Sequence, residues 1–418
     1  MSATPVQEVV VTGLGATTPL GGNVASTWEA LLAGRSGIRR IDDEDHEWVT
    51  RHDLPVKIAA PLAVSPTEVL PRVKARRLDR CEQVALVAAK EAWEHAGLGE
   101  PGEQVDPTRL AVVIGTGVGG VITLLEQDDL LEQGGLRKVS PLTVPMLMPN
   151  GPAAWVGIEY GAQGAVHAPV SACASGAEAL AWALRLLRAD EVDVVIAGGA
   201  EACITGLTVA GFAQARTLSL RNDEPERASR PFDVDRDGFV LGEGSGIMIL
   251  ERAEFAAARG ATVRGRLAGA GITADADHIT GPEPEGRGQA RAITAALRSA
   301  GLDPSDIGHV NCHATSTVAG DVGETRAVRK ALGDHPVLTA PKSALGHMVG
   351  AAGAVESIIT LLSISEGIIP ATLNLEKLDP GVELDVVAGE PRKMDLQAAV
   401  CDSFGFGGHN AAVVFTKV

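Results

Sequence analysis

The chain alternates short runs of β-branched residues with longer segments rich in Ala and Leu, and this alternation limits the folds open to it. Apolar runs of the length of buried strands lie at residues 8–12, 110–114, 192–196 and 307–311. Segments with the length and composition of helices lie at 81–96, 174–189, 287–300, 322–332 and 350–366. This pattern predicts βαβ units around sheets that are covered on both faces, which is an α/β fold.

Composition and a weak internal sequence repeat suggest how this fold is built. Hydrophobic residues make up 45% of the chain, yet aromatics make up 3% and Gly numbers 49, so packing must use Ala, Val, Leu and close backbone approach. The start, VVVTGLGA, resembles GRLAGAGIT at 265–273, where a strand again leads into a Gly-rich turn. We therefore expect two related halves, residues 1–260 and 261–418.

Charge argues against several classes of partner. The formal net charge is −17, which disfavours general binding to nucleic acid or to an anionic membrane. We see no apolar run of the roughly 18 residues that a membrane span needs. The first residues, MSATPVQEVVVTG, lack the charged region and apolar core of a signal peptide, so we expect a cytoplasmic protein.

Cysteine usage points to the same compartment. The count is odd and no pair has CxxC spacing, which argues against a disulfide framework or a zinc site and favours reduced thiols. Most of these thiols are expected to pack as small apolar residues, and one of them to be reactive. The five are Cys81, Cys173, Cys203, Cys312 and Cys401.

Cys173 is the candidate nucleophile. It lies in PVSACASGAEALAWAL (169–184), where a strand ends, a turn of small residues follows and an Ala-rich helix begins. The positive end of a helix dipole and free N–H groups at that place favour a thiolate and can hold an oxyanion. A buried structural cysteine in a tight turn is the alternative interpretation.

Two histidines in unusual settings are candidate partners for this thiol. His313 opens HATSTVAGD, and His347 lies in APKSALGHMVGAAGA together with Lys342. Asp321 and Glu324, three residues apart, share one face if a helix begins there. Taken by itself, each histidine is more often a structural or surface residue than a catalytic one. The segment DSFGFGGHN (402–410) forms a glycine-rich turn between two strands, whose N–H groups could approach a substrate.

A competing motif suggests a nucleotide site. Gly115, Gly117 and Gly120 in VVIGTGVGG follow a strand with GxGxxG spacing. A dinucleotide fold also needs an acidic residue at the end of a strand about 20 residues later. Asp128 and Asp129 lie in a helix-like stretch instead, so the motif is weak evidence for a dehydrogenase.

Together these segments resemble the β-ketoacyl-acyl-carrier-protein synthases, most closely the type II elongating enzymes of bacteria. The segments KVSPLTVPMLMPNG and LDVVAGEPRK resemble the sequences of the actinobacterial members. The resemblance covers nearly the whole chain and is carried by VVVTGLGATTPLG, VSACASGAEAL, RNDEPERASRPFDVDRDGFVLGEG, HVNCHATST, PKSALGH and SFGFGGHN. The family implies a thiolase-like fold, with two similar α/β halves stacked in alternating α-β-α-β-α layers, usually as a homodimer. It implies no metal and no cofactor.

The resemblance also implies roles for individual residues. Cys173 matches the acylated nucleophile, and His313 and His347 match the pair that supports decarboxylation of a malonyl thioester. Lys342 matches a lysine that orders the site, with Asp321 and Glu324 as its expected partners. Phe406 matches a mobile gate whose N–H joins that of Cys173 in an oxyanion hole. The expected reaction is a decarboxylative Claisen condensation that lengthens an acyl chain by two carbons.

Further matches concern the substrate and its carrier. Val118, Phe212 and Thr280 match positions that line the acyl or pantetheine channels. The carrier protein is acidic in this family, and Arg137, Lys138 and Arg216 match the docking positions. In the basic run at 72–80, the possible additions to this docking surface are Arg72, Lys74, Arg76 and Arg77.

Three other functions compete with this one. A non-catalytic synthase-like partner, or a paralogue tied to a specialised pathway, would share the fold, but the presence of Cys173 and both histidines favours catalysis. A thiolase acting on coenzyme A would carry a second cysteine in its C-terminal glycine-rich loop, whereas Cys401 precedes that loop inside a strand. A nucleotide-dependent dehydrogenase would rest on the weak glycine motif alone.

Overall fold

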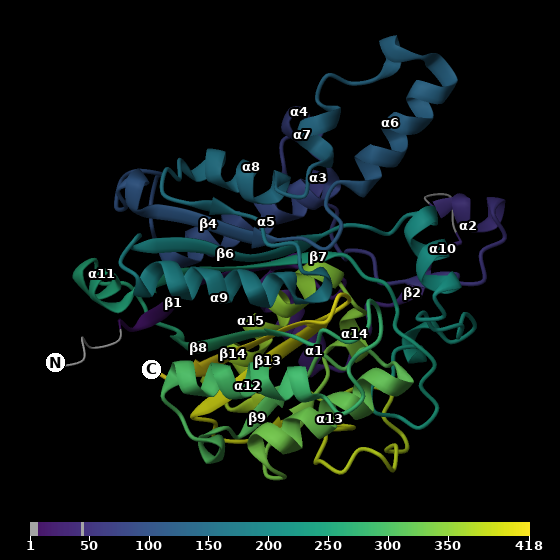
Figure 1. Cartoon of the computed structure of the whole chain (residues 1–418). Coiled ribbons are helices and arrows are strands. Elements are labelled where there is room, and N and C mark those ends of the chain that lie inside the picture. The colour runs from purple at the N-terminus through teal and green to yellow at the C-terminus, as the bar shows by residue number, and fades with distance from the viewer. Residues whose placement is uncertain (1–6, 43–45) are drawn as a thin grey trace.

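The computed structural model describes residues 7–42 and 46–418 and contains a mixed sheet of ten strands (Figure 1). The strands run in the order β10-β9-β13-β14-β8-β1-β7-β6-β4-β5. One half of the sheet consists of β1 (Val9–Thr17), β4 (Leu110–Gly115), β5 (Val166–His167), β6 (Val194–Glu201) and β7 (Gly244–Arg252). The other half consists of β8 (Gly265–Ala274), β9 (His309–Asn311), β10 (Val337–Thr339), β13 (Ala398–Gly405) and β14 (His409–Thr416).

The two halves of the sheet repeat one topology. In each half the first strand pairs antiparallel with the last, the last pairs antiparallel with the fourth, and the second pairs in parallel with both the fourth and the third. Among the described residues, strands of the two halves pair with each other only in a short β1–β8 ladder, Val10 with Arg266 and Val11 with Gly265. This is the layered α/β architecture that the sequence predicts, while the boundary at residues 260 and 261 stays a prediction.

Helices form three layers around the two halves of the sheet. α5 (Arg80–Ala96) and α8 (Gly151–Tyr160) cover one outer face, and α12 (Arg287–Ala300) and α13 (Val318–Leu332) cover the other (Figure 1). α9 (Ser175–Arg188) and α15 (Ala352–Glu366) lie between the halves and contact both. The predicted strands and helices are therefore confirmed, with α13 beginning four residues earlier than expected.

Local sequence explains where these helices begin and end. The Asp79 side chain accepts a hydrogen bond from Cys81 N, 2.9 Å away, and Glu82 bonds back to Asp79 N, which forms a capping box at the start of α5. Gly97, with φ of 65°, ends the same helix in the left-handed conformation that Gly tolerates. All residues of β4 and β6 are buried, as expected for parallel strands covered on both faces.

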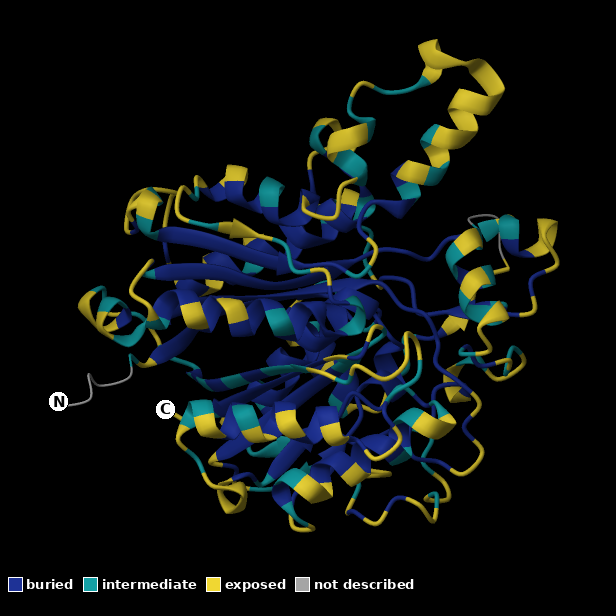
Figure 2. Ribbon diagram, viewed as in Figure 1, coloured by how far each residue is buried: buried dark blue, intermediate teal, exposed yellow. Residues whose placement is uncertain are grey.

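A few segments project from the layers. α6 (Val121–Gly134) and α7 (Thr143–Leu147) form an excursion whose surface is largely exposed (Figure 2), and α10 (Gly206–Gln214) lies at another edge. The remaining longer helices are α1 (Val24–Leu32) and α11 (Ala253–Ala258). The short elements are α2 (Trp48–Arg51), α3 (Pro66–Val69), α4 (Arg72–Ala75), α14 (Lys342–Leu345), β2 (Arg39–Arg40), β3 (Ile58–Ala59), β11 (Ile368–Ile369) and β12 (Arg392–Lys393).

One described stretch has the length and apolar composition of a membrane span, contrary to the expectation from the sequence. It runs over Val349–Glu366 and includes α15. Because 83% of it is buried inside the protein, it has the surroundings of a core helix.

The central helices α9 and α15 touch through their backbones near their first turns. A Cβ placed on Gly176 would lie 2.9 Å from both Ala354 N and Gly350 O. A Cβ on Gly353 would lie 3.0 Å from Ala177 N. Only glycine fits such a contact without a shift of the neighbouring backbone, so this packing fixes the distance between the two helix starts.

We predict that Gly176→Val separates the two helices and destabilises the protein. Overpacking of this kind typically costs about 1–3 kcal/mol, so the midpoint of urea unfolding should fall. Gly211→Ala in α10 is the matched control, because a Cβ there meets nothing within 4 Å and Ala favours a helix. An unchanged midpoint for Gly176→Val would show that the contact is not tight.

Candidate active site

Cys173 lies on a strained turn that leads into α9. The turn is the short 3₁₀ helix Ala172–Ala174, and Ala172 has φ of 50°, a conformation that costs a non-glycine residue energy. Ser175 Oγ accepts a hydrogen bond from Ser171 N at 2.9 Å and can donate to Thr116 O at 2.9 Å. These bonds hold the turn, and Cys173 stays partly accessible while Ala174 is buried. The predicted position of Cys173 at a helix start is confirmed.

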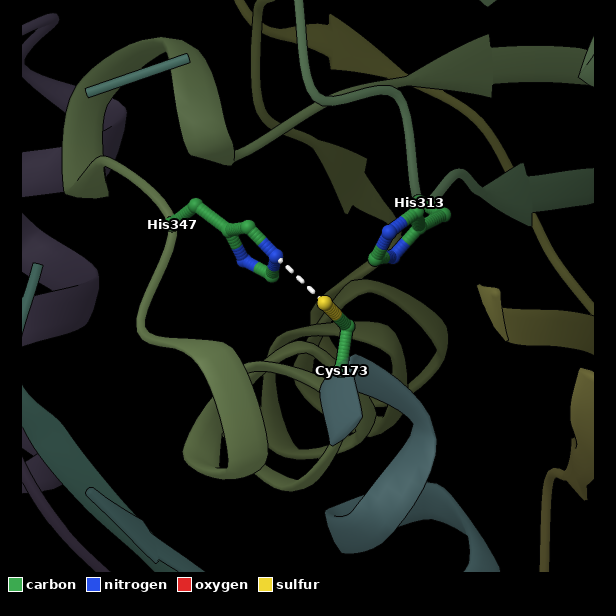
Figure 3. A group of neighbouring side chains, drawn as sticks. All are labelled: Cys173, His313 and His347. Atoms are coloured by element: carbon green, nitrogen blue, oxygen red, sulfur yellow. Dashed lines mark hydrogen bonds between the residues drawn. The ribbon is translucent and has the colours of Figure 1, made fainter. Parts of the chain in front are cut away.

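The two predicted histidines lie beside this thiol (Figure 3). His347 Nε2 is 3.0 Å from Cys173 Sγ. The rings of His313 and His347 are 5.3 Å apart between centroids and nearly perpendicular, at 86°. His313 follows β9, and His347 follows α14, so three segments distant in sequence meet at one point.

Burial keeps both imidazoles neutral. It lowers the pKa of His313 and of His347 well below the usual value, and the positive charge of Lys342 lowers both further. A neutral imidazole carries one N–H, which can donate to a developing oxyanion, and one bare nitrogen, which can accept a proton. The Nδ1 atoms of both rings are buried and have no hydrogen-bond partner among the described residues.

Burial also dominates the thiol, contrary to the expectation of a thiolate at a helix start. Desolvation raises the pKa of Cys173 to about 11, although the charge of Lys342 and the backbone N–H groups of Phe406 and Cys173 act in the opposite direction. The thiol is therefore protonated at neutral pH. His347 Nε2, at 3.0 Å, is placed to take its proton during attack.

Two buried carboxyl groups hold His313 in place. Its backbone N–H donates to Glu324 Oε1 at 2.6 Å and to Asp402 Oδ1 at 2.8 Å, and Ala314 N donates to Glu324 Oε2 at 2.7 Å. Burial and the neighbouring Asp402 raise the pKa of Glu324 well above its usual value, and burial raises the pKa of Asp402 to about 6. Two carboxyls so close favour sharing one proton.

The partner of Lys342 is not among the expected carboxylates. Its Nζ lies 2.6 Å from Glu356 Oε1 on α15, and both side chains are almost fully buried. Asp321 instead lies 3.4 Å from Arg236 Nε and accepts hydrogen bonds from Phe232 N and Ser316 N. Asp321 faces Arg236 because it lies in the first turn of α13, whereas Glu324 is one turn further along.

Sequence reasoning missed Glu356 and Asp402. Glu356 is the one acid in the interior of α15, whose other acid, Glu366, is its last residue, and an isolated acid inside a core helix is a usable signal for a buried ion pair. Asp402 lies inside the DSFGFGGHN segment, which was interpreted from its glycines and Phe406 alone. Its side chain points to His313 only because β9 and β13 are neighbours in the sheet.

The backbone N–H groups of Phe406 and Cys173 lie close enough to the reactive sulfur to act on its pKa. Both lower the pKa of Cys173 by hydrogen bonding. Gly405 allows this approach, because a Cβ there would lie 2.6 Å from Ser171 O and 3.0 Å from Cys173 N. Two such donors beside a nucleophile have the arrangement of an oxyanion hole.

A cavity of about 300 Å³ opens onto Cys173, His313 and His347. One part of its wall is apolar, with Val118, Phe212, Phe239 and Val349, and another is polar, with Thr280, Thr315, Thr317 and Asn410. All three residues expected to bind substrate therefore line it. Phe406 also lines it, and its ring lies 6.3 Å from that of Phe212.

The glycine loop after β4 does not offer a phosphate site. Its N–H groups are already used by the buried Glu201, which accepts from Gly117 N at 2.6 Å and from Val118 N at 3.3 Å. A Cβ on Gly120 would lie 2.0 Å from Met146 O, so that glycine permits close packing. The loop forms part of the cavity wall instead.

The residues expected to dock a carrier protein lie on exposed segments. Arg137 and Lys138 are exposed at the end of the α6 excursion, and Arg216 is exposed just after α10. In the second basic segment, Lys74 already pairs with Glu159 at 2.5 Å. The exposed basic residues there are Arg72, Arg76 and Arg77.

Comparison with solved structures defines the class of protein. The fold matches a β-ketoacyl synthase from Burkholderia phymatum with a TM-score of 0.91 and 35% identity, over 99% of this chain and 100% of that one. It also matches, with a TM-score of 0.91 and 30% identity over 99% of each chain, a type II polyketide ketosynthase solved with its acyl carrier protein. The chain therefore has the thiolase-like fold of the ketosynthases.

Comparison of sequences defines the family. The N-terminal domain model of β-ketoacyl synthases matches residues 6–256, and the C-terminal domain model matches residues 264–376. The 3-oxoacyl-[acyl-carrier-protein] synthase 2 of Mycobacterium tuberculosis is 49% identical over 98% of this chain and 97% of its own length. The Synechocystis protein of that name is 43% identical over 98% of each. The chain belongs to the β-ketoacyl synthase family and is a condensing acyltransferase.

We predict that alkylation of Cys173 by iodoacetamide accelerates steadily from pH 7 to pH 10. Because the pKa of the thiol is raised to about 11, the thiolate fraction should grow about tenfold per pH unit over this range. Mass spectrometry of the Cys173 peptide measures the rate, and Cys173→Ser should abolish the label. A plateau below pH 8 would contradict a protonated thiol.

Proposed function

We propose that this protein is a 3-oxoacyl-acyl-carrier-protein synthase that elongates fatty-acyl chains by two carbons, with Cys173 as the acylated nucleophile. The observation that carries the proposal is the 3.0 Å contact between Cys173 Sγ and His347 Nε2, with a second neutral histidine, His313, beside it in one cavity. A hydrolase needs one base beside its nucleophile. Two neutral imidazoles that can donate N–H groups therefore fit the stabilisation of an enolate better than they fit hydrolysis.

In the first half-reaction Cys173 takes the acyl group from its carrier. The sulfur attacks the thioester carbon as its proton passes to His347 Nε2, and the N–H groups of Cys173 and Phe406 stabilise the oxyanion. The carbon–sulfur bond to the carrier then breaks, and the departing thiolate takes the proton. The products are an acyl-Cys173 thioester and a free carrier thiol.

In the second half-reaction the malonyl thioester loses CO₂ and becomes a carbanion. Its electron pair spreads onto the thioester oxygen, to which His313 donates an N–H hydrogen bond, and to which His347 donates one after its proton has moved from Nδ1 to Nε2. Each such donor is typically worth about 10²–10³ in rate. The carbanion attacks the acyl-Cys173 carbonyl and expels the Cys173 thiolate. One proton is consumed, which restores the thiol.

The surrounding residues fit supporting roles in this scheme. The Lys342–Glu356 pair places a balanced charge beside the histidines, and Glu324 with Asp402 fixes the His313 backbone. Val118 and Phe212 form the apolar wall for the acyl chain, with Phe406 between that wall and the sulfur as a gate. Thr280 lies at the outer, exposed rim, where the carrier arm would enter.

The two-half division supports the same assignment. We place the nucleophile in the half formed by residues 1–260, and the histidines, lysine and gating phenylalanine in the half formed by residues 261–418. The repeated strand order supports this division. The site then lies between the two halves and uses the start of α9 from the first half and the start of α15 from the second.

The thiolase alternative lacks its second cysteine. Cys401 is fully buried in β13, and Cys173 is the only cysteine that lines the cavity in the described part of the chain. A non-catalytic partner subunit would have no use for the nucleophile and the histidine pair. We place the protein in the cytoplasm, because all five cysteines are free thiols.

We predict that mass spectrometry will find an acyl adduct on Cys173 after incubation with a long-chain acyl carrier protein. With malonyl carrier protein added, a 3-oxoacyl product two carbons longer should form. Cys173→Ala should lose both signals, while Cys81→Ala, which changes a thiol buried in α5, should keep them. Absence of an adduct with every acyl length offered would move the protein to the non-catalytic class.

The carrier is expected to dock on the exposed basic residues Arg137, Lys138 and Arg216. We predict that the double variant Arg137→Glu and Lys138→Glu raises KM for acyl carrier protein about tenfold and weakens the salt dependence of association. kcat should change little, because both residues lie outside the cavity. Lys330→Glu, on the outer helix α13, is the control; an equal effect there would exclude a specific docking surface.

A homodimer fits the exposed end of the sheet. Both residues of the terminal strand β5 are exposed, and apolar side chains gather around it: Val166 is 45%, Val170 52% and Ile158 71% exposed. An open strand edge favours pairing with a second copy across a two-fold axis.

We predict that Ile158→Asp combined with Val170→Asp gives a monomer in sedimentation equilibrium, because like charges would face each other across the axis. Leu220→Asp, at another exposed apolar position, should leave the dimer intact. A dimer that survives the double substitution would place the interface elsewhere.

A further inference from the structure

The side chains of Cys173, His313 and His347 form a cluster with the donor set of a metal site. One ligand atom from each residue, the thiol sulfur and a ring nitrogen of each histidine, lies within 4.8 Å of the other two. The three come from separate segments and point toward one another (Figure 3). The spacing of the cysteines in the sequence gives no sign of such a site, because only one of its ligands is a cysteine.

The distances suit a small tetrahedral cation. Zn²⁺ binds cysteine sulfur at about 2.3 Å and imidazole nitrogen at about 2.0–2.1 Å, so tetrahedral ligand atoms lie about 3.5 Å apart. Cys173 Sγ and His347 Nε2 are now 3.0 Å apart, and no pair exceeds 4.8 Å. Small side-chain rotations would bring all three atoms to the required separation.

We infer that the cavity binds one Zn²⁺ ion through Cys173 Sγ and a ring nitrogen of both His313 and His347, and that the bound ion blocks acylation. The fourth position faces the cavity and takes a water molecule. Binding forms a zinc–sulfur bond and releases the thiol proton to solvent, without any change of oxidation state. A sulfur bonded to the metal cannot attack a thioester, so the ion and the acyl group exclude each other.

The surroundings make this a reversible inhibitory site rather than a structural one. A zinc-bound histidine usually donates its second N–H to a carboxylate or a carbonyl, and loss of such a partner costs about 10–100-fold in affinity. The Nδ1 atoms of His313 and His347 have no partner among the described residues. The nearby cation Lys342 is balanced by Glu356 at 2.6 Å, which limits its repulsion of the ion.

Titration of the purified protein with ZnCl₂ in a calorimeter tests the inference. We expect one ion per chain, with affinity reduced at least about tenfold by Cys173→Ser and by His347→Gln. Cys81→Ala, which alters a thiol in the core of α5, should bind as the wild type does. Alkylation of Cys173 in the folded wild-type protein should also abolish binding, and circular dichroism of the alkylated protein checks that its fold is retained. This experiment tests the site even if one of the variants misfolds.

Co²⁺ supplies a readout that a nonspecific site would not give. A cobalt–thiolate bond absorbs in the near ultraviolet, so the band should appear with wild type and not with Cys173→Ser. Binding that survives both Cys173→Ser and alkylation, or the absence of the cobalt band, would overturn the inference. Neither measurement uses condensation, so failure here and failure of the proposed function are distinguishable.

Discussion

The structure depends on the backbone contact between α9 and α15 at the centre of the molecule. Gly176 and Gly353 let the two helices meet near their first turns, at a separation that a single methyl group would disturb. Cys173 precedes the first of these helices and His347 the second, so the contact sets the 3.0 Å distance between thiol and imidazole. A chain with 49 glycines and 3% aromatics is suited to this packing.

Desolvation then decides the protonation states of the site. A helix start and a neighbouring lysine both favour a thiolate, yet burial outweighs them and raises the pKa of Cys173 to about 11. The same burial lowers the pKa of both histidines, with the charge of Lys342 acting in the same direction. The outcome is a neutral thiol beside two neutral imidazoles. This state suits a site in which an imidazole first accepts the thiol proton and the imidazoles later stabilise an enolate.

Periodicity was enough to predict the alternating strands and helices, because it is a local property of the chain. The stacked layers and the grouping of Cys173 with His313 and His347 were expected from the resemblance to a family, and the structure brings these three side chains together. The partner of Lys342 was predicted wrongly. Asp321 and Glu324 follow His313 closely and were expected to pair with the lysine, but the lysine meets Glu356, 14 residues further on in the next helix. Glu201 likewise looks like the end of an ordinary strand until the fold brings Gly117 and Gly350 to its carboxylate. Such pairings are set by the packing of distant segments, which spacing alone does not encode.

The central claim is that the resting site holds a neutral thiol and two neutral imidazoles. Nitrogen-15 NMR of histidine-labelled protein, titrated from pH 5 to pH 8 with Cys173→Ser for comparison, tests it most directly. The account predicts that the His313 and His347 signals keep neutral imidazole shifts throughout, because the pKa of each is well below its usual value. An imidazolium signal from either ring near pH 7 that disappears in Cys173→Ser would reveal a thiolate–imidazolium pair and contradict the account.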